Sequence, residues 1–182
     1  IQPNGAREYH VRRNSLDNSE NAEMFLVTGN IEIIESAFFY YSAVRDRAWL
    51  GDHMEGLEQS LSLVESCIDR QGRLWSDVYY EDQVIKDGRE CMAQALAARS
   101  FELMAQLEEV LKRDRQAEHY RTVSKILGKA LVESLPAGFW DASKNRFVDW
   151  VDRNSVPHDH IHLLANELPS LFHYTKPEQE DG

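Results

Sequence analysis

Long apolar runs are missing from this sequence of 182 residues. Hydrophobic residues make up 42 % and charged residues 28 %, and no run reaches the roughly 18 apolar residues of a membrane-spanning helix. Alternation of apolar and polar residues with a period of two is also missing, which argues against a large sheet. No apolar signal segment is recognisable, so the sequence assigns no compartment, and a cytoplasmic location is favoured.

Positive charge is scarce as well. Lys and Arg number 20 against 31 Asp and Glu, which gives a formal net charge of −11 at pH 7. Nucleic acids and anionic membranes bind through clustered Lys and Arg, so we expect neither as a partner. A neutral, hydroxyl-rich ligand such as a sugar is unaffected by this charge. Solubility is the simplest explanation of the acidic composition.

Cysteine occurs only twice, at Cys67 and Cys91. Neither residue has the Cys-x-x-Cys or His/Cys spacing of a zinc site. A disulfide and two buried thiols both fit the pattern. Free thiols are favoured, because a chain of this length can bury a substantial core without one bridge. The sequence predicts no cofactor.

The apolar residues follow helical spacing. In the clearest segment, apolar side chains recur in steps of four and three on one helical stripe: Leu50, Met54, Leu57, Leu61, Val64 and Ile68. An earlier helix is predicted from Ile31 to Tyr41, with Asn30 as its N-cap. Only residues 44–47 separate the two patterns, so we expect an antiparallel pair.

The pattern repeats further along the chain. A helix is predicted over Glu90–Lys112, and after a tight turn a second helix continues to Leu135. A last helical stretch is expected over His160–Tyr174, bent or shortened at Pro169. The turns within the pairs are short, whereas the connections that follow them, Asp69–Arg89 and Pro136–Asp159, are long. Long ordered loops are usually functional.

This alternation of short and long connections predicts the architecture. If the helix pairs stack side by side, all the long loops emerge at one end. The sequence therefore predicts an all-α fold of antiparallel helical hairpins, a partial helical toroid with its long loops on one face. An orthogonal bundle is the alternative, but it does not require the alternation.

Aromatic rings and carboxylates stand together in the first long loop, as Trp75, Asp77, Tyr79, Tyr80, Glu81 and Asp82. Pyranose rings stack their C–H groups on Trp and Tyr, and their hydroxyls need polar partners. Glycoside hydrolysis also needs two carboxyl groups, one of which donates a proton. We therefore interpret this loop as a sugar site. Chance clustering in an acidic protein is the competing interpretation.

Histidines and an aspartate cluster in the segment His158-Asp159-His160-Ile161-His162. Residues two apart do not share a helical face, and no His-Glu-x-x-His pattern is present. We therefore expect no metal site here. Hydrogen bonding to sugar hydroxyls or to the loop backbone is the favoured interpretation.

Three stretches of the chain carry a family resemblance. The first is Tyr40–Leu74, the second joins Leu74-Trp75-Ser76-Asp77 to the helix start Gly88–Leu96, and the third comprises Gly138–Asp149 with His158–Leu168. Together they resemble the six-hairpin (α/α)6 glycosidases, especially the glucosidase domain of glycogen-debranching enzymes and related bacterial glycoside hydrolases. Similar hairpins occur in rhamnosidase-like enzymes, sugar epimerases and unsaturated glucuronyl hydrolases.

The resemblance implies hydrolysis of an O-glycosidic bond by single displacement, of the α-glucosidase or debranching type. The Asp of the family's Trp-x-Asp element is its general acid, which implies that Asp77 is catalytic. Glu81 and Asp82 compete for this role because they lie on the same loop. Glu167 stands where the family has a Gln. Substrate contacts are implied for Trp75, Tyr79, Tyr80, Glu81, Asp82, Glu90, Trp150, His158 and Asn166.

Two other functions stay open. One is a sugar isomerase or epimerase on the same toroid, in which His158, His160 or His162 takes a proton from carbon. The other is a non-catalytic helical scaffold that binds carbohydrate. The aromatic residues in the long loops stand against the scaffold, because repeat scaffolds normally have short, uniform loops.

We expect residues 1–182 to form one domain that is about half of a larger (α/α)6 catalytic domain. Thr175, Pro177 and Glu178 form a capping-box pattern that predicts a helix start close to Gly182. Only two full hairpins and one arm of a third are recognisable, and no second catalytic carboxylate is matched. The expected partners are an oligosaccharide or glycoside substrate and the remainder of the domain or a complementary chain.

Overall fold

The computed structural model describes residues 5, 27–76, 78–80 and 84–180, with the backbone alone for residues 78–80 and 84–85. Most of this part is helical. The α-helices are α2 (Val27–Val44), α3 (Arg47–Ser66), α4 (Cys91–Val110), α5 (Asp114–Leu131) and α6 (Leu163–Leu171), and a 3-10 turn, η1, covers Pro177–Gln179. Among the helices of this part of the chain, none has both the length and the apolar character needed to cross a membrane.

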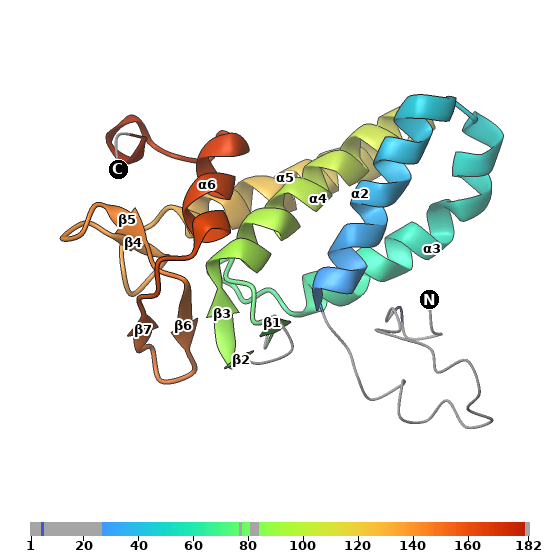
Figure 1. The fold of residues 1–182 in the computed structure, drawn as a ribbon. Coiled ribbons are helices and arrows are strands. Elements are labelled where there is room, and N and C mark those ends of the chain that lie inside the picture. Colours follow the sequence, from blue (N-terminus) through green and yellow to red (C-terminus); the bar gives the residue numbers. More distant parts are fainter. Residues whose placement is uncertain (1–4, 6–26, 77, 81–83, 181–182) are drawn as a thin grey trace, which may run out of the picture.

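The helices form the two predicted hairpins, α2 with α3 and α4 with α5 (Figure 1). Asp46 starts α3 as its N-cap, because its Oδ1 accepts the N–H of Trp49 at 3.0 Å. Helix α4 packs against α2, α5 and α6, and α2, α4 and α6 run in the same direction in Figure 1. This central position explains why α4 is buried on nearly all of its sides.

Two predictions about helix ends are wrong. Asn30 does not cap a helix, because α2 already includes Val27 and Asn30 lies buried within it. Its Nδ2 donates to the carbonyl oxygens of Gly5 at 2.7 Å and Ser60 at 3.1 Å. The helix predicted at Thr175 is only the 3-10 turn η1, which begins two residues later.

The core consists of two apolar clusters. The larger one lies between α2, α3, α4 and α5, and its fully buried members include Ile34, Leu50, Leu61, Phe101, Met104 and Leu127. The smaller one lies where α4 and α6 meet the C-terminal strands, and it includes Met92, Phe139, Phe147, Val151 and Leu168. Cys67 and Cys91 are free thiols, as the sequence favoured.

Short antiparallel strands occupy the long connections, so the prediction of an all-α fold is too simple. Strand β3 (Gly88–Glu90) pairs with β6 (Trp150–Asp152), and β6 pairs with β7 (Pro157–His158). Two further pairs are β1 (Val78–Tyr80) with β2 (Val84–Lys86) and β4 (Trp140–Asp141) with β5 (Arg146–Phe147). In Figure 1 the strands gather at the end of the bundle where α4 begins, away from the α2–α3 turn.

One glycine is required for this arrangement. Gly88 has a φ of +125°, and a Cβ atom at this position would come within 2.5 Å of the carbonyl oxygen of Val151. Only glycine allows the backbones of β3 and β6 to approach so closely with this φ. The pairing of β3 with β6 brings the first long connection against the second.

Candidate functional site

A buried group of three charges lies where β3 meets the start of α4. The Nζ atom of Lys86 donates to Glu90 Oε1 and to Asp149 Oδ1, at 2.8 Å in both cases. The exposed fractions of these residues are 4 %, 0 % and 3 %. One cation between two carboxylates leaves the group one negative charge when all three are ionised.

The backbone places these three residues together. Lys86 ends β2, and Glu90 ends β3 and stands at the N-cap position of α4. Asp149 precedes β6, and its carbonyl oxygen accepts the N–H of Cys91 at 3.0 Å. The helix start therefore holds both carboxylates near the positive end of the α4 dipole.

Burial and charge act in opposite directions on these groups. Burial raises the pKa of Glu90, and the hydrogen bond and charge of Lys86 only partly offset this effect. Burial lowers the pKa of Lys86, but the hydrogen bonds to Asp149 and Glu90 outweigh it and raise the pKa overall. Lys86 therefore stays protonated, while Glu90 holds a proton more readily than an ordinary glutamate.

Glu90 and Trp150 face each other in register across β3 and β6. Residues opposed in this way present their side chains on the same face of a sheet. Glu90 Oε2 and Trp150 Nε1 are both buried and have no hydrogen-bond partner in the described part of the chain. They offer one acceptor and one donor, the two kinds of partner that hydroxyl groups need.

The other neighbour of Trp150 is His158, its register partner on β7. The two rings stack with centroids 3.8 Å apart and planes 9° from parallel. His158 Nε2 lies 3.3 Å from Asp152 Oδ2. Backbone N–H groups of the β6–β7 turn and the His158 side chain bind the Asp152 carboxylate and lower its pKa. Asp152 thus fixes the position of the His158 ring.

Charged side chains surround the Trp75 indole ring. Its Nε1 donates to Asp69 Oδ2 at 2.9 Å. The guanidinium carbons of Arg73, Arg89 and Arg153 lie 5.6, 5.7 and 5.9 Å from its ring centre, within the range of cation–π attraction. The side chain remains partly exposed.

The loop that carries Trp75 is attached to the strands. The N–H of Ser76 donates to the carbonyl oxygen of Gly88 at 2.9 Å. Arg89 is almost fully buried, and its guanidinium donates to the carbonyl oxygens of Pro136 and Ala137. These contacts place Trp75 at the same end of the bundle as Glu90 and Trp150.

The predicted site residues have different outcomes. Glu90, Trp150 and His158 lie together, with Trp75 at the same end of the bundle. Asn166 joins α6 to β5, because its Oδ1 accepts the N–H of Phe147 at 2.9 Å. Three further predictions, Asp77, Glu81 and Asp82, lie outside the described residues, and Tyr79 and Tyr80 are described only as the backbone of β1.

Sequence reasoning missed Lys86 and Asp149 as members of the site. A usable signal was present, because Lys86 is the only cation between residues 77 and 87, a stretch with four carboxylates. A buried carboxylate needs a cation or hydrogen-bond donors. The pairing of Lys86 with Asp149, 63 residues away, leaves no local pattern.

The histidine-rich segment does not assemble ligands for a metal. His158 stacks on Trp150, and the Asp159 carboxylate binds Arg146 and Lys144. Within the described residues, no group of three or more His, Cys, Asp or Glu side chains is placed to hold a metal ion.

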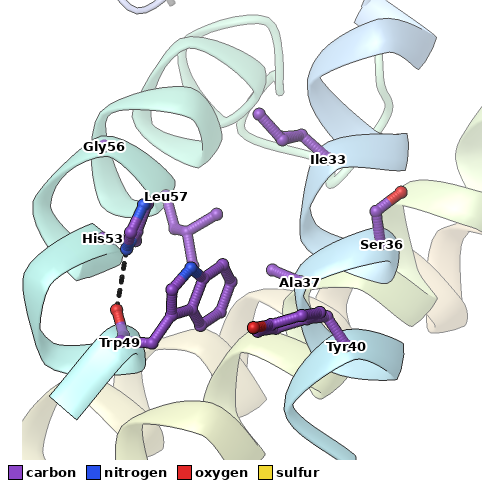
Figure 2. A pocket seen from close by; sticks show the side chains of 8 residues that line it. All are labelled: Ile33, Ser36, Ala37, Tyr40, Trp49, His53, Gly56 and Leu57. Atoms are coloured by element: carbon purple, nitrogen blue, oxygen red, sulfur yellow. Dashed lines mark hydrogen bonds between the residues drawn. The ribbon is translucent and has the colours of Figure 1, made fainter. Parts of the chain in front are cut away.

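A separate hollow lies between α2 and α3, towards their tight turn. Figure 2 shows the Trp49 and Tyr40 rings at its wall, with Ile33, Ala37 and Leu57 around them. Its volume is about 390 Å³. The lining is almost wholly apolar and shares no residue with the group around Glu90.

No protein-family model matches this sequence, and no curated protein matches it. Among solved structures, the chain is similar to a GH78 family rhamnosidase of Bacillus sp. GL1, with a TM-score of 0.75 and 14 % sequence identity. The likeness covers 86 % of this chain and 17 % of the rhamnosidase chain. At this identity the likeness concerns the fold, and the chain therefore has a helical, glycosidase-like fold.

Proposed function

We propose that this chain forms part of a glycoside hydrolase and binds sugar at the strand-covered end of its bundle. The observation that carries the proposal is the pair formed by Glu90 Oε2 and Trp150 Nε1, a buried acceptor and a buried donor opposed across β3 and β6. Sugar hydroxyls donate and accept hydrogen bonds, so they are suitable partners for both atoms.

The neighbouring residues would support sugar binding. Lys86 occupies Oε1 of Glu90, which leaves Oε2 as the atom for the ligand. The partly exposed Trp75 supplies an aromatic surface for the C–H groups of a pyranose ring. His158 is positioned by Asp152 and would orient a further hydroxyl, together with Tyr79 and Tyr80 of the first loop.

For hydrolysis we propose Asp77 as the general acid, which donates a proton to the glycosidic oxygen. Water attacks the anomeric carbon in a single displacement and loses its proton to a second carboxylate. Glu81 and Asp82 are the alternatives for the acid.

The substrate would be an O-glycoside of the α-glucosidase or debranching type. The parallel helices α2, α4 and α6 would form part of the inner wall of an (α/α)6 toroid. The remainder of that domain, or a complementary chain, would complete it.

Sugar binding is the primary test, because the second carboxylate is unassigned. Tryptophan fluorescence is titrated with L-rhamnose, glucose and maltooligosaccharides. We expect saturable binding by at least one of them. Trp150→Phe, which keeps a ring but removes the N–H, should weaken it by about tenfold, the cost of one buried hydrogen bond. Trp140→Phe is the matched control, because Trp140 packs on Phe147 in β5. Absence of saturable binding across the panel would overturn the proposal.

Hydrolysis is tested by the release of p-nitrophenol from aryl α-glycosides. Any activity should fall by about 10² to 10⁴ in Asp77→Asn, with unchanged helical content by circular dichroism. Near-normal turnover in Asp77→Asn would transfer the acid role to Glu81 or Asp82, which Glu81→Gln and Asp82→Asn distinguish.

A sugar isomerase or epimerase is the second candidate, supported by the contact between His158 and Asp152. A carboxylate beside an imidazole fixes the orientation of the ring, and an oriented imidazole can take a proton from carbon as a general base. Incubation with a reducing sugar should then yield an isomer. A product of hydrolysis without isomer formation would exclude this function.

A further inference from the structure

A cavity of about 400 Å³ opens between α4, α5 and the segment that follows α6. It shares no residue with the group around Glu90. Basic residues from three elements line it: Arg99 from α4, Lys125 and Lys129 from α5, and His173 after α6. Of the lining residues in the described part of the chain, Glu102 alone is acidic.

The lysines of this cavity, Lys125 and Lys129, form no ion pairs in the described part of the chain, although the chain carries a net charge of −11. The two lysines are one turn apart on α5, where like charges repel. Arg99 has its guanidinium 5.7 Å from the Phe172 ring centre rather than on a carboxylate.

Some other cations near helices α3 to α5 do form ion pairs. Arg113 pairs with Glu58, and Arg121 pairs with Glu109. A concentration of cations around a concave surface favours an anionic ligand, although Lys125 and Lys129 are exposed, so that salt screens this attraction. Two lysines and an arginine match the nearly two negative charges of a phosphate monoester better than the single charge of a carboxylate.

The remaining walls are suited to the organic part of such a ligand. The Phe172 and Tyr174 rings and Val132 line the cavity, and Ser124 adds a hydroxyl. Ser124 Oγ donates to the carbonyl oxygen of Ala98 at 2.8 Å and is also a hydrogen-bond partner of the Tyr174 side chain, so it helps to position the Tyr174 ring at the cavity wall. Aromatic faces beside a polar group are a typical surrounding for a small ring with hydroxyls.

We propose that this cavity binds a small phosphate ester of sugar size. Arg99, Lys125 and Lys129 neutralise the phosphate, and Phe172 and Tyr174 contact the organic part. Binding at this cavity is independent of the glycosidase proposal, because the two groups of residues do not overlap.

The test is calorimetric titration of the full chain with glucose 6-phosphate, inorganic phosphate and glucose. Glucose 6-phosphate should bind saturably and more tightly than inorganic phosphate, and added salt should weaken its binding. Binding of glucose should not respond to substitutions in the cavity. Lys125→Gln combined with Lys129→Gln should weaken glucose 6-phosphate binding by at least about tenfold.

The matched control is Arg47→Gln combined with Lys112→Gln, which removes the same charge from exposed positions outside the cavity. It should leave glucose 6-phosphate binding within about twofold of the unaltered chain. Thermal unfolding verifies that both variants are folded. The proposal is overturned by the absence of saturable binding, by equal affinity for inorganic phosphate, or by equal loss in the control.

Discussion

The ring of Tyr174 lies against the backbone of Gly128. A Cβ atom at position 128 would come within 2.6 Å of the ring's Cδ1 and 2.8 Å of its Cε1. Glycine is a poor helix former, and the close approach of this ring explains its presence within α5. The contact fixes the segment that follows α6 on α5.

Gly128→Ala should therefore destabilise the protein, although alanine is the better helix former. The added methyl group forces the Tyr174 ring to move, at a cost of about 1–3 kcal/mol. Gly51→Ala is the control, because Gly51 lies in α3 with no atom within 4 Å of its added Cβ. Gly51→Ala should stabilise the protein by about 0.5–1 kcal/mol. Urea unfolding measures both, and equal effects would contradict the prediction.

The second prediction concerns Glu108 of α4, whose side chain is fully buried with Oε2 3.2 Å from Arg113 Nε. The pKa of Glu108 is raised to about 7, because burial and the neighbouring Glu58 carboxylate raise it by more than the charge of Arg113 lowers it. Between the usual value of 4.5 and about 7, the folded state holds a proton that the unfolded state releases. The stability that Glu108 contributes is therefore fully present below pH 4.5, its usual pKa, and is lost as the pH rises through about 7.

Glu108→Gln should remove this pH dependence. The difference in unfolding free energy between the variant and the unaltered chain should grow in favour of the variant as pH rises from about 5 to 8. Glu109→Gln, one residue along on the exposed side of α4, controls for the loss of one charge. A difference that does not change with pH would contradict the assignment.

The helices could be predicted because burial along a helix follows a local period. Leu50, Met54, Leu57, Leu61 and Val64 all came from one stripe and are at most 4 % exposed. Asn30 was misplaced because its partner Ser60 is 30 residues away. Strands β3 and β6 have three residues each and pair across a separation of some 60 residues. They are too short to show the alternation of apolar and polar residues from which strands are predicted.

The candidate site could be predicted only in part, because its residues are brought together by contacts between distant parts of the chain. Glu90 and Trp150 could be selected by residue type and motif. Their juxtaposition depends on Gly88, which permits the close approach of β3 and β6. The role of Asp77 stays a prediction from sequence resemblance.

The third prediction concerns Asp69, which holds Trp75 in place. Burial raises the pKa of Asp69, but the hydrogen bonds from Trp75 and from Arg73 lower it overall. Its contribution to stability is therefore present above the usual value of 3.8 and is lost as pH falls through the lower folded-state pKa. Asp69→Asn should cost about 1–2 kcal/mol at neutral pH and shift the Trp75 emission. Unchanged emission would show that Asp69 does not hold the Trp75 side chain in place.

The last prediction concerns Lys86, the cation shared by Glu90 and Asp149. Lys86→Met leaves two buried carboxylates without their positive partner, and the loss of one member of a buried ion group costs about 3–5 kcal/mol. The variant should regain stability as pH falls, because protonation of Glu90 removes the unpaired charge. Glu90→Gln added to Lys86→Met should recover part of the loss at neutral pH, and a double-mutant cycle measures this coupling. Lys144→Met is the control, since Lys144 pairs with Asp159 at the surface, where the loss of an ion pair has little effect. If Lys86→Met is no more costly than Lys144→Met, the three buried charges do not hold this end of the bundle together.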